Sequence, residues 1–281
     1  TNAEGNFFVD STCIDCDACR QLAPEVFARR GEMSAVVRQP ETSEEELRAG
    51  KALISCPTAS IGTVERTDLS AAVAALPERV EENVWRCGFN SEKSFGAFSY
   101  LIRSDRGGYL VDSPRFSRPL LRNIRRLGPV GKMLLTHSDD VADHRLWNDE
   151  LECDRVMHRR DLSASTRDVE LQPEGDDPLV LADDLLMIPT PGHTRGHAVF
   201  LYRSKFLFSG DHLAWSPNRN DLIAFRGVCW YDWQEQIRSM EKLLDYEFEW
   251  ILPGHGRPAR LEAGEMRARL GHLVDWMRSV A

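Results

Sequence analysis

Four polar motifs, each directly after a short apolar run, constrain the fold of this chain more than any other feature. The apolar runs have the length of buried strands, and the motifs that follow them combine His, Asp and Gly. The motifs are THSDDVADH at 136–144, TPGHTRGH at 190–197, GDH at 210–212 and PGH at 253–255. Because strand ends deliver distant residues to one edge of a sheet, we expect an α/β layered fold in which these motifs meet.

The remaining pattern of apolar and polar residues predicts where strands and helices lie. We expect strands over 132–136, 185–188, 198–202, 206–208 and 250–252, and a hairpin of 98–102 and 109–111 joined through Arg106-Gly107-Gly108. We expect helices over about 69–76, 119–126, 233–244 and 262–278. Pro77 follows the first of these helices and indicates a domain boundary near residue 78. The chain is therefore expected to have a small domain over 1–78 and a larger one over 79–281.

The order and spacing of the four motifs resemble those of the metallo-β-lactamase superfamily over about residues 80–281. The resemblance implies a four-layered αββα sandwich with one or two divalent metals. It assigns His193 to a first metal, Asp211 to a bridge between two metals, and His255 to the second metal. Neutral imidazole and carboxylate are ligands that Zn²⁺ and Fe²⁺ accept.

The first motif departs from the family pattern H-x-H-x-D-H. His137 aligns with its start and Asp143-His144 with its end, but Asp139 stands at the second His and two residues are inserted. Either Asp139 or Asp140 can then be the ligand. Zn, Fe and Mn all stay open, although oxygen in place of nitrogen favours Fe or Mn. The favoured assignment is His137, Asp139, His193 and Asp211 for one metal, and Asp143, His144, Asp211 and His255 for the other. Asp143 and Asp211 are the candidate catalytic residues.

A cysteine run near the start of the chain predicts a separate metal site. Cys13, Cys16 and Cys19 are each two residues apart, and Cys56 is followed by Pro57. Ala23 stands where a two-cluster protein has a further Cys before Pro, so one cluster is expected. This segment resembles the single-cluster bacterial ferredoxins over about residues 6–65. The resemblance implies a small α+β domain holding a [4Fe–4S] cluster for one-electron transfer; structural and sensing roles, or a zinc site, are the alternatives.

Charge and cysteine usage exclude several classes of protein. The formal net charge of -9 argues against nucleic-acid binding, because proteins bind a phosphate backbone through clustered Lys and Arg. No apolar run reaches the ~20 residues that a membrane-spanning helix needs. Seven cysteines, an odd and clustered set, argue against a disulfide scaffold and for a reducing compartment. The fused arrangement resembles proteins of photosynthetic bacteria and plastids, which implies cytoplasm or chloroplast stroma.

These features favour a metal-dependent hydrolase of an ester, thioester or phosphoester, joined to an electron-transfer or redox-sensing domain. No G-x-S-x-G elbow or Cys/His pair predicts a side-chain nucleophile, so a metal-activated water is expected to attack. The alternative is an oxidoreductase with a flavodiiron-like di-iron site fed by the cluster; a binding module ranks third. A small-molecule substrate and a redox partner protein are the expected partners. Arg195 and Arg257 either bind an anionic substrate or cap loops and pair with nearby carboxylates. His197 and His212 are either structural, or lie beside the metals or facing the substrate.

Overall fold

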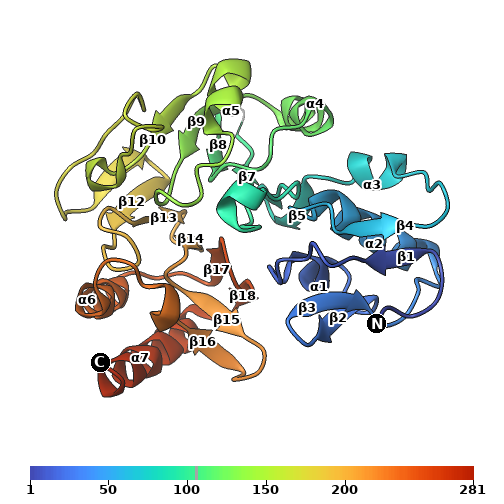
Figure 1. Cartoon of the computed structure of the whole chain (residues 1–281). Helices are drawn as coiled ribbons and strands as arrows, with labels where there is room; N and C mark the ends of the chain where they lie inside the picture. The colour runs from blue at the N-terminus through green and yellow to red at the C-terminus, as the bar shows by residue number, and fades with distance from the viewer. Residues whose placement is uncertain (105–106) are drawn as a thin grey trace. The chain divides into compact units, whose positions relative to one another are not determined.

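The computed structural model describes residues 1–104 and 107–281, and the chain divides into two units. The first unit comprises residues 1–133 and 141–153, and the second comprises 134–140 and 154–281. Figure 1 shows the elements in chain order, from β1 in blue to α7 in red. No helix in the described residues is long and apolar enough to cross a bilayer. The domain boundary expected near residue 78 stays a prediction.

The first unit begins with two small antiparallel strand pairs and two helices. Strand β1 (Phe7–Val9) pairs with β4 (Ile61–Thr63), and β2 (Phe27–Arg30) pairs with β3 (Met33–Val36). Helix α2 (Ser43–Ser55) packs against α1 (Ala18–Leu22). Thr42 caps α2 by accepting a hydrogen bond from the Glu45 N–H, and three glutamates occupy the first turn, where the helix dipole favours negative charge. Since α2 ends at Ser55, its C-cap residue is Cys56.

The rest of the first unit contains a sheet and short helices. Strands β5, β6, β7 and β8 pair antiparallel in that order, and β9 follows β8 in the same sheet. Strands β7 and β8 form the predicted hairpin, although Arg106 of its turn lies outside the described residues. Ser117 caps α4, which buries Leu120, Leu121 and Ile124. The elements are β5 (Glu78–Glu81), β6 (Val84–Arg86), β7 (Tyr100–Ile102), β8 (Gly108–Val111), β9 (Val130–Leu134), α3 (Ser70–Ala74), α4 (Arg118–Leu127), α5 (His144–Leu151) and the 3₁₀ turn η1 (Glu92–Ser94).

The second unit is built on a six-stranded sheet in the order β11-β12-β13-β14-β17-β18. Its neighbouring strands are antiparallel except β14 and β17, which are parallel. The sheet strands are β11 (Leu179–Ala182), β12 (Leu185–Pro189), β13 (Ala198–Tyr202), β14 (Phe206–Gly210), β17 (Trp250–Pro253) and β18 (Ala259–Arg260). The other elements are β10 (Asp154–Val156), β15 (Ala214–Ser216), β16 (Asp221–Ile223), α6 (Trp233–Leu243), α7 (Ala263–Ser279) and the turns η2 (Arg159–Asp161) and η3 (Arg226–Val228).

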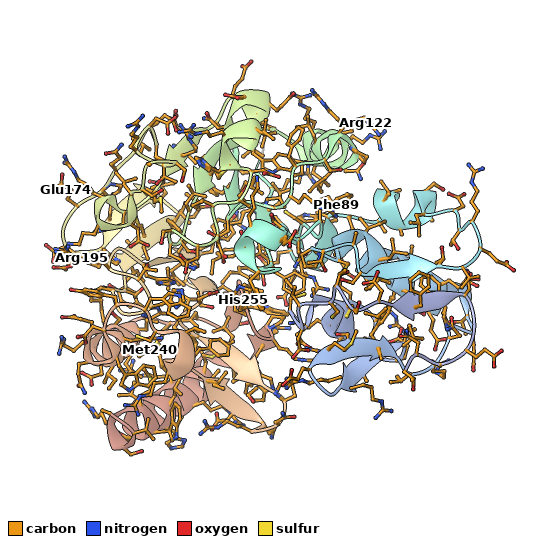
Figure 2. The ribbon with its side chains drawn as sticks, viewed as in Figure 1. Phe89, Arg122, Glu174, Arg195, Met240 and His255 are labelled. Atoms are coloured by element: carbon orange, nitrogen blue, oxygen red, sulfur yellow. The ribbon has the colours of Figure 1, made fainter. Side chains whose placement is uncertain are left out.

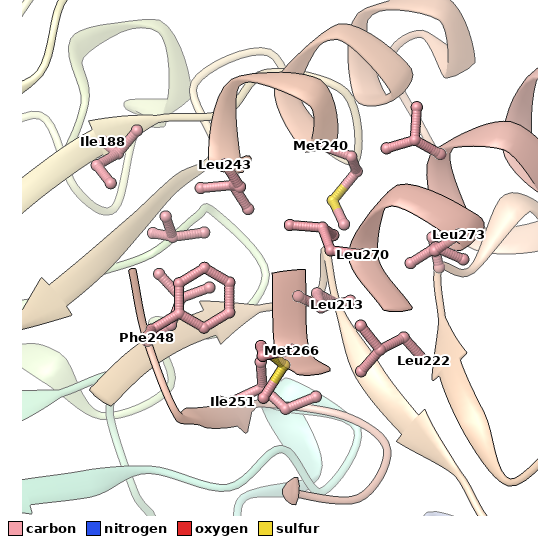
Figure 3. Close-up of a cluster of buried hydrophobic side chains, with 14 of the residues drawn as sticks. Ile188, Leu213, Leu222, Met240, Leu243, Phe248, Ile251, Met266, Leu270 and Leu273 are labelled. Carbon is pink, nitrogen blue, oxygen red and sulfur yellow. The ribbon is translucent and has the colours of Figure 1, made fainter. Parts of the chain in front are cut away.

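Helices α6 and α7 close the hydrophobic core of this unit. Met240 of α6, Leu270 of α7 and Ile251 of β17 are buried together with side chains of β12 to β14, as Figure 3 shows. Burying each such side chain stabilises the fold by about 1.5–3 kcal/mol. All five residues of β13 and of β14 are buried, so both faces of these strands are covered. The strand ends are therefore fixed by a packed core.

The sheet register gathers the motifs of the second unit at one edge. Gly210 pairs with Pro253 in the parallel β14–β17 ladder, so the chain leaves both strands side by side toward Asp211 and His255. Pro189 pairs with Ala198, which makes residues 190–197 the loop between β12 and β13. Ala198 N–H also donates to the carbonyl of Thr136, beside His137.

Candidate functional site

Three histidines converge on one carboxylate of the second unit. The Oδ2 atom of Asp211 lies 3.7 Å from the Nε2 of His137, 3.6 Å from that of His193 and 3.9 Å from that of His255. These separations are too long for hydrogen bonds. Ligand atoms about 2.0–2.1 Å from a tetrahedral metal stand roughly 3.4 Å apart, so the spacing suits a shared ion.

The two candidate carboxylates of the first motif both reach this group. His137, Asp139 and His193 each place one ligand atom within 4.8 Å of the others, and so do His137, Asp140 and Asp211. Asp139 Oδ2 is 3.4 Å from His193 Nε2. Asp140 is buried, whereas Asp139 is exposed. Geometry therefore leaves room for both carboxylates around His137.

The electrostatics of the group favour a bound cation. The contact with His193 holds the pKa of Asp139 below its usual value. Burial alone would raise the pKa of Asp211, but His255 and His137 outweigh it and hold that pKa far below the usual value. Both carboxylates are thus ionised at neutral pH. Among the described residues, neither ring nitrogen of buried His193 nor Oδ1 of Asp211 has a hydrogen-bond partner. Buried polar atoms rarely stay unsatisfied, so the residues fit a divalent metal.

The four cysteines of the N-terminal run line one cavity in the first unit. Cys13, Cys16, Cys19 and Cys56 surround it, together with apolar residues such as Ile14 and Pro57. Burial raises the pKa of the Cys16 thiol to about 12 and that of Cys19 to about 11. Thiolates in such a pocket need the positive charge of a metal. Four cysteine sulfurs around one cavity are the donor set of a [4Fe–4S] cluster.

Comparison with known proteins finds relatives of both parts of the chain. Residues 9–63 match the family described as the 4Fe-4S single cluster domain of Ferredoxin I. The structure is similar to a DIM-1 metallo-β-lactamase, with a TM-score of 0.56 and 19% identity over 73% of this chain and 96% of that one. The chain joins a ferredoxin-type [4Fe–4S] domain to a metallo-β-lactamase fold. Both resemblances drawn from the sequence, and the expected α/β fold, are confirmed.

Two further relatives show the extent of this similarity in structure and in sequence. A metallo-β-lactamase from Pontibacter korlensis has a TM-score of 0.54 and 14% identity, covering 71% of this chain and 97% of that one. At such identities the likeness shows the metallo-β-lactamase fold alone. The beta-lactamase-like protein 2 homolog of Drosophila melanogaster is 32% identical over 87 residues, which are 31% of this chain. The match spans only 26% of that curated relative.

His197 fixes the backbone of Asp211 in the metallo-β-lactamase fold. Its Nε2 accepts a hydrogen bond from the Asp211 N–H at 3.3 Å, and its Nδ1 is 2.9 Å from Thr190 Oγ1. Burial and the neighbouring His212 hold the pKa of His197 well below its usual value, so the ring is neutral. A side chain at Gly210 would come within 2.5 Å of His197 Nε2. Of the roles expected for His197, the structure supports the structural one.

Asp161, which the sequence motifs do not include, ties two of the metal-site loops together. Its buried carboxylate accepts hydrogen bonds from Ser138 N–H at 3.0 Å, Thr194 Oγ1 at 2.5 Å and Gly196 N–H at 2.5 Å. Ser138 follows His137, and Thr194 follows His193. Residues that hydrogen-bond to metal ligands or to the loops that carry them commonly influence metal affinity. A lone Asp in a turn after β10 carries no motif that would have identified it.

Asp143 and His144 belong to the first unit. The Asp143 carboxylate accepts hydrogen bonds from Lys93 Nζ at 2.7 Å and from the Phe116 N–H at 2.8 Å. Burial opposes ionisation of Asp143, but Lys93 and the Phe116 N–H outweigh it and lower the pKa. His144 is buried at the first turn of α5. Their assignment to a second metal stays a prediction, as does the catalytic role of Asp143.

Arg20 is the residue of the cysteine loop that sequence reasoning missed. Asp15 and Asp17 adopt left-handed backbone angles, with φ of 58° and 67°. The buried Arg20 guanidinium donates to both of their carboxylates, each at 2.5 Å, and to Ser34 Oγ at 3.0 Å. These ion pairs hold the loop between the cysteines in its turn conformation. The only sequence signal was an arginine directly after Cys19.

Proposed function

We propose that the chain is a metal-dependent hydrolase of the metallo-β-lactamase superfamily that acts on an ester, thioester or phosphoester of a small molecule. The observation that carries this proposal is the convergence of three imidazoles on the buried Asp211 carboxylate, at 3.6, 3.7 and 3.9 Å. A divalent metal held there supplies Lewis acidity and lowers the pKa of water from 15.7 to about 7. The fold does not choose among substrates.

The protein's own residues prepare the centre for this chemistry. Ionised Asp211 and Asp139 supply the negative charge that a divalent cation requires, while neutral His197 keeps Asp211 in place. Asp139 is the accessible carboxylate of the group, with 45% of its side chain exposed. We assign Asp139 the side that faces water and substrate, where its carboxylate can accept a proton from the attacking water.

We further propose that Cys13, Cys16, Cys19 and Cys56 hold one [4Fe–4S] cluster that transfers single electrons or senses redox state. Support comes from the cavity that the four sulfurs share and from the family matched over residues 9–63. A redox partner protein would exchange electrons with the cluster. Thiolate-bound clusters persist in reducing surroundings, so we place the protein in cytoplasm or chloroplast stroma.

One observation favours a second function, an oxidoreductase with a di-iron site fed by the cluster. Three carboxylates, Asp139, Asp140 and Asp211, stand around His137, which makes the donor set rich in oxygen. Oxygen ligands are hard and favour Fe over Zn compared with an all-imidazole site. The hydrolase stays first because the solved structures with this fold that the chain resembles are named as metallo-β-lactamases.

Metal and sulfide analysis of the anaerobically purified chain tests both proposals. We expect about four irons with matching sulfide and up to two zincs. Hydrolysis of a nitrophenyl ester, an acyl thioester and a nitrophenyl phosphodiester is then compared in Asp211→Asn and in the matched control Asp221→Asn. The first variant should lose zinc and turnover, and the second should keep both.

Three other results would change the assignment. Further iron without sulfide, with oxygen or nitric oxide consumption and no hydrolysis, would favour the oxidoreductase. Zinc without any sulfide would contradict the assignment of a [4Fe–4S] cluster to the cysteines. Unchanged metal content and turnover in Asp211→Asn would contradict the assignment of Asp211 to the metal centre.

A further inference from the structure

A polar cavity of about 440 Å³ in the second unit contains none of the predicted metal ligands. Four cationic side chains and two carboxylates line it: Arg160, Arg195, Arg238, Lys242, Asp176 and Glu235. In Figure 2, Arg195 lies at the outer edge of the unit, well away from His255 near the centre of the view. Arg195 of the lining therefore lies apart from that ligand of the candidate metal centre.

The positive charges of this cavity exceed the negative ones. Arg160 pairs with Asp176 and Arg238 pairs with Glu235, each at 2.5 Å. Lys242 donates instead to two backbone carbonyls, those of Asp176 and Pro189. The lining thus carries two more positive charges than negative ones, and Asp176, Asp177 and Glu235 act on Lys242 as nearby charges.

Two features leave these charges available to an anion. Burial lowers the pKa of Lys242, which means that its ammonium loses hydration in the folded chain. Within the described parts of the chain, Arg195 has no hydrogen bond or ion pair, and its exposed guanidinium lines the cavity. An anion between them would offset the lost hydration of Lys242 and would give Arg195 a charged partner.

We propose that this cavity binds the anionic group of a small molecule, a phosphate ester or a carboxylate. A guanidinium can donate two parallel hydrogen bonds to either group, and the surplus of two positive charges suits an anion of up to two charges. The volume of the cavity lies in the range of roughly 300–1,000 Å³ that is typical of small-molecule sites, and it exceeds the volume of a bare anion. Tyr231 and Pro191 form the wall against which the organic part would pack.

Residues of the cavity lining also contact the loop of a predicted metal ligand. Pro191 and Arg195 flank His193 in one loop, and the Tyr231 N–H donates to the His193 carbonyl at 3.1 Å. Arg160 directly precedes Asp161, which holds Thr194 and Gly196. The cavity is nevertheless a site of its own, and its occupant needs no metal. The inference thus goes beyond the proposed hydrolysis and can fail or succeed separately from it.

Calorimetric titration of the full chain at constant ionic strength tests this site. The probes are ribose 5-phosphate, succinate and, as a neutral control, ribose. We expect one equivalent of an anionic probe to bind and ribose not to bind. Binding of ribose 5-phosphate alone assigns a phosphate ester, and binding of succinate alone assigns a carboxylate. Arg195→Gln should weaken binding about tenfold, because it removes a charge-assisted hydrogen bond.

Matched variants separate this site from the metal centre. Arg267→Gln, an exposed position of α7 with the same change of charge, should bind like the unaltered protein. Asp211→Asn should also keep the probe affinity, even where it loses metal and hydrolysis. Absence of binding by either anion, equal affinity in Arg195→Gln, or loss of binding in Asp211→Asn would each overturn the proposal.

Discussion

The cysteine site and the histidine–aspartate centre obtain their ligands in opposite ways. Three cysteines come from one short loop, and the fourth is the C-cap residue of α2. The ligands of the histidine centre instead come from the ends of separate strands, and they meet only because the register of β12, β13, β14 and β17 aligns those ends. One site depends on local chain geometry, and the other depends on the whole sheet.

This difference predicts how each site is held. The cysteine loop is held by a residue inside the loop, Arg20, through ion pairs with Asp15 and Asp17. The histidine centre is held by Asp161, which lies outside its metal motifs, and by Thr190, which contacts His197. The cysteine site should therefore respond to local changes, and the histidine centre should respond to changes at distant positions of the chain.

The largest expected effect is the loss of the cluster from the cysteine site, with no change at the histidine centre. Cys16→Ala removes one of four iron ligands, so the iron, the acid-labile sulfide and the reduced-cluster EPR signal should all be lost. Zinc content at the histidine centre should not change, because none of its ligands lies in that loop. Metal analysis with EPR checks this, and Cys229→Ser, a half-buried thiol outside the cavity, is the control. A simultaneous loss of zinc would show that the two sites are not independent.

Asp161→Asn tests the histidine centre by changing a residue outside its metal motifs. The amide keeps the size of the carboxylate but loses its charge, and its NH₂ faces at least one N–H that already donates there. Zinc affinity should fall by about 10–100-fold, the usual cost of losing a partner behind the ligands. Competition with a chelator measures this fall, and turnover per bound zinc should be largely kept.

Asp154→Asn, at an exposed position of β10, is the matched control for this variant. It should leave zinc affinity unchanged. If Asp161→Asn bound zinc normally but turned over slowly, the residue would act in the reaction and not in positioning.

The two kinds of site also explain how much could be read from the sequence. Strands such as β13 and helices such as α6 were predicted nearly to their ends, because buried apolar runs and helical periodicity are local signals. The cysteine set followed from spacing alone. Asp161 could not be found in this way, since its role depends on a turn that tertiary folding brings against two other loops. Likewise, nothing local indicated that Arg20 would be buried beside left-handed Asp15 and Asp17.

A smaller effect is expected at Gly96, which lies against the cysteine site. Its φ is +85°, and an added Cβ would lie 2.7 Å from the Cβ and 2.9 Å from the Sγ of Cys16. Gly96→Ala should therefore combine backbone strain, about 1 kcal/mol or more, with displacement of an iron ligand. Faster loss of the cluster's visible absorbance in air should follow.

Gly31 offers a control for Gly96 with the same strain and no collision. Its φ is +67°, and nothing lies within 4 Å of an added Cβ. Gly31→Ala should lower stability in urea while keeping the cluster as long as the unaltered protein does. Equal cluster lifetimes in both variants would mean that Gly96 does not constrain Cys16.

The smallest effect tests whether helix α2 itself presents Cys56. Thr42→Ala removes the N-cap acceptor of the Glu45 N–H, at a cost of about 1 kcal/mol. Ser117→Ala removes the equivalent cap of α4 in the same unit, where no cysteine ligand follows. Both variants should lower the urea midpoint by similar amounts, but only Thr42→Ala should shorten the cluster lifetime. If Ser117→Ala shortened it equally, the cluster would report the stability of the whole unit, and the histidine centre would no longer be the only site that depends on distant structure.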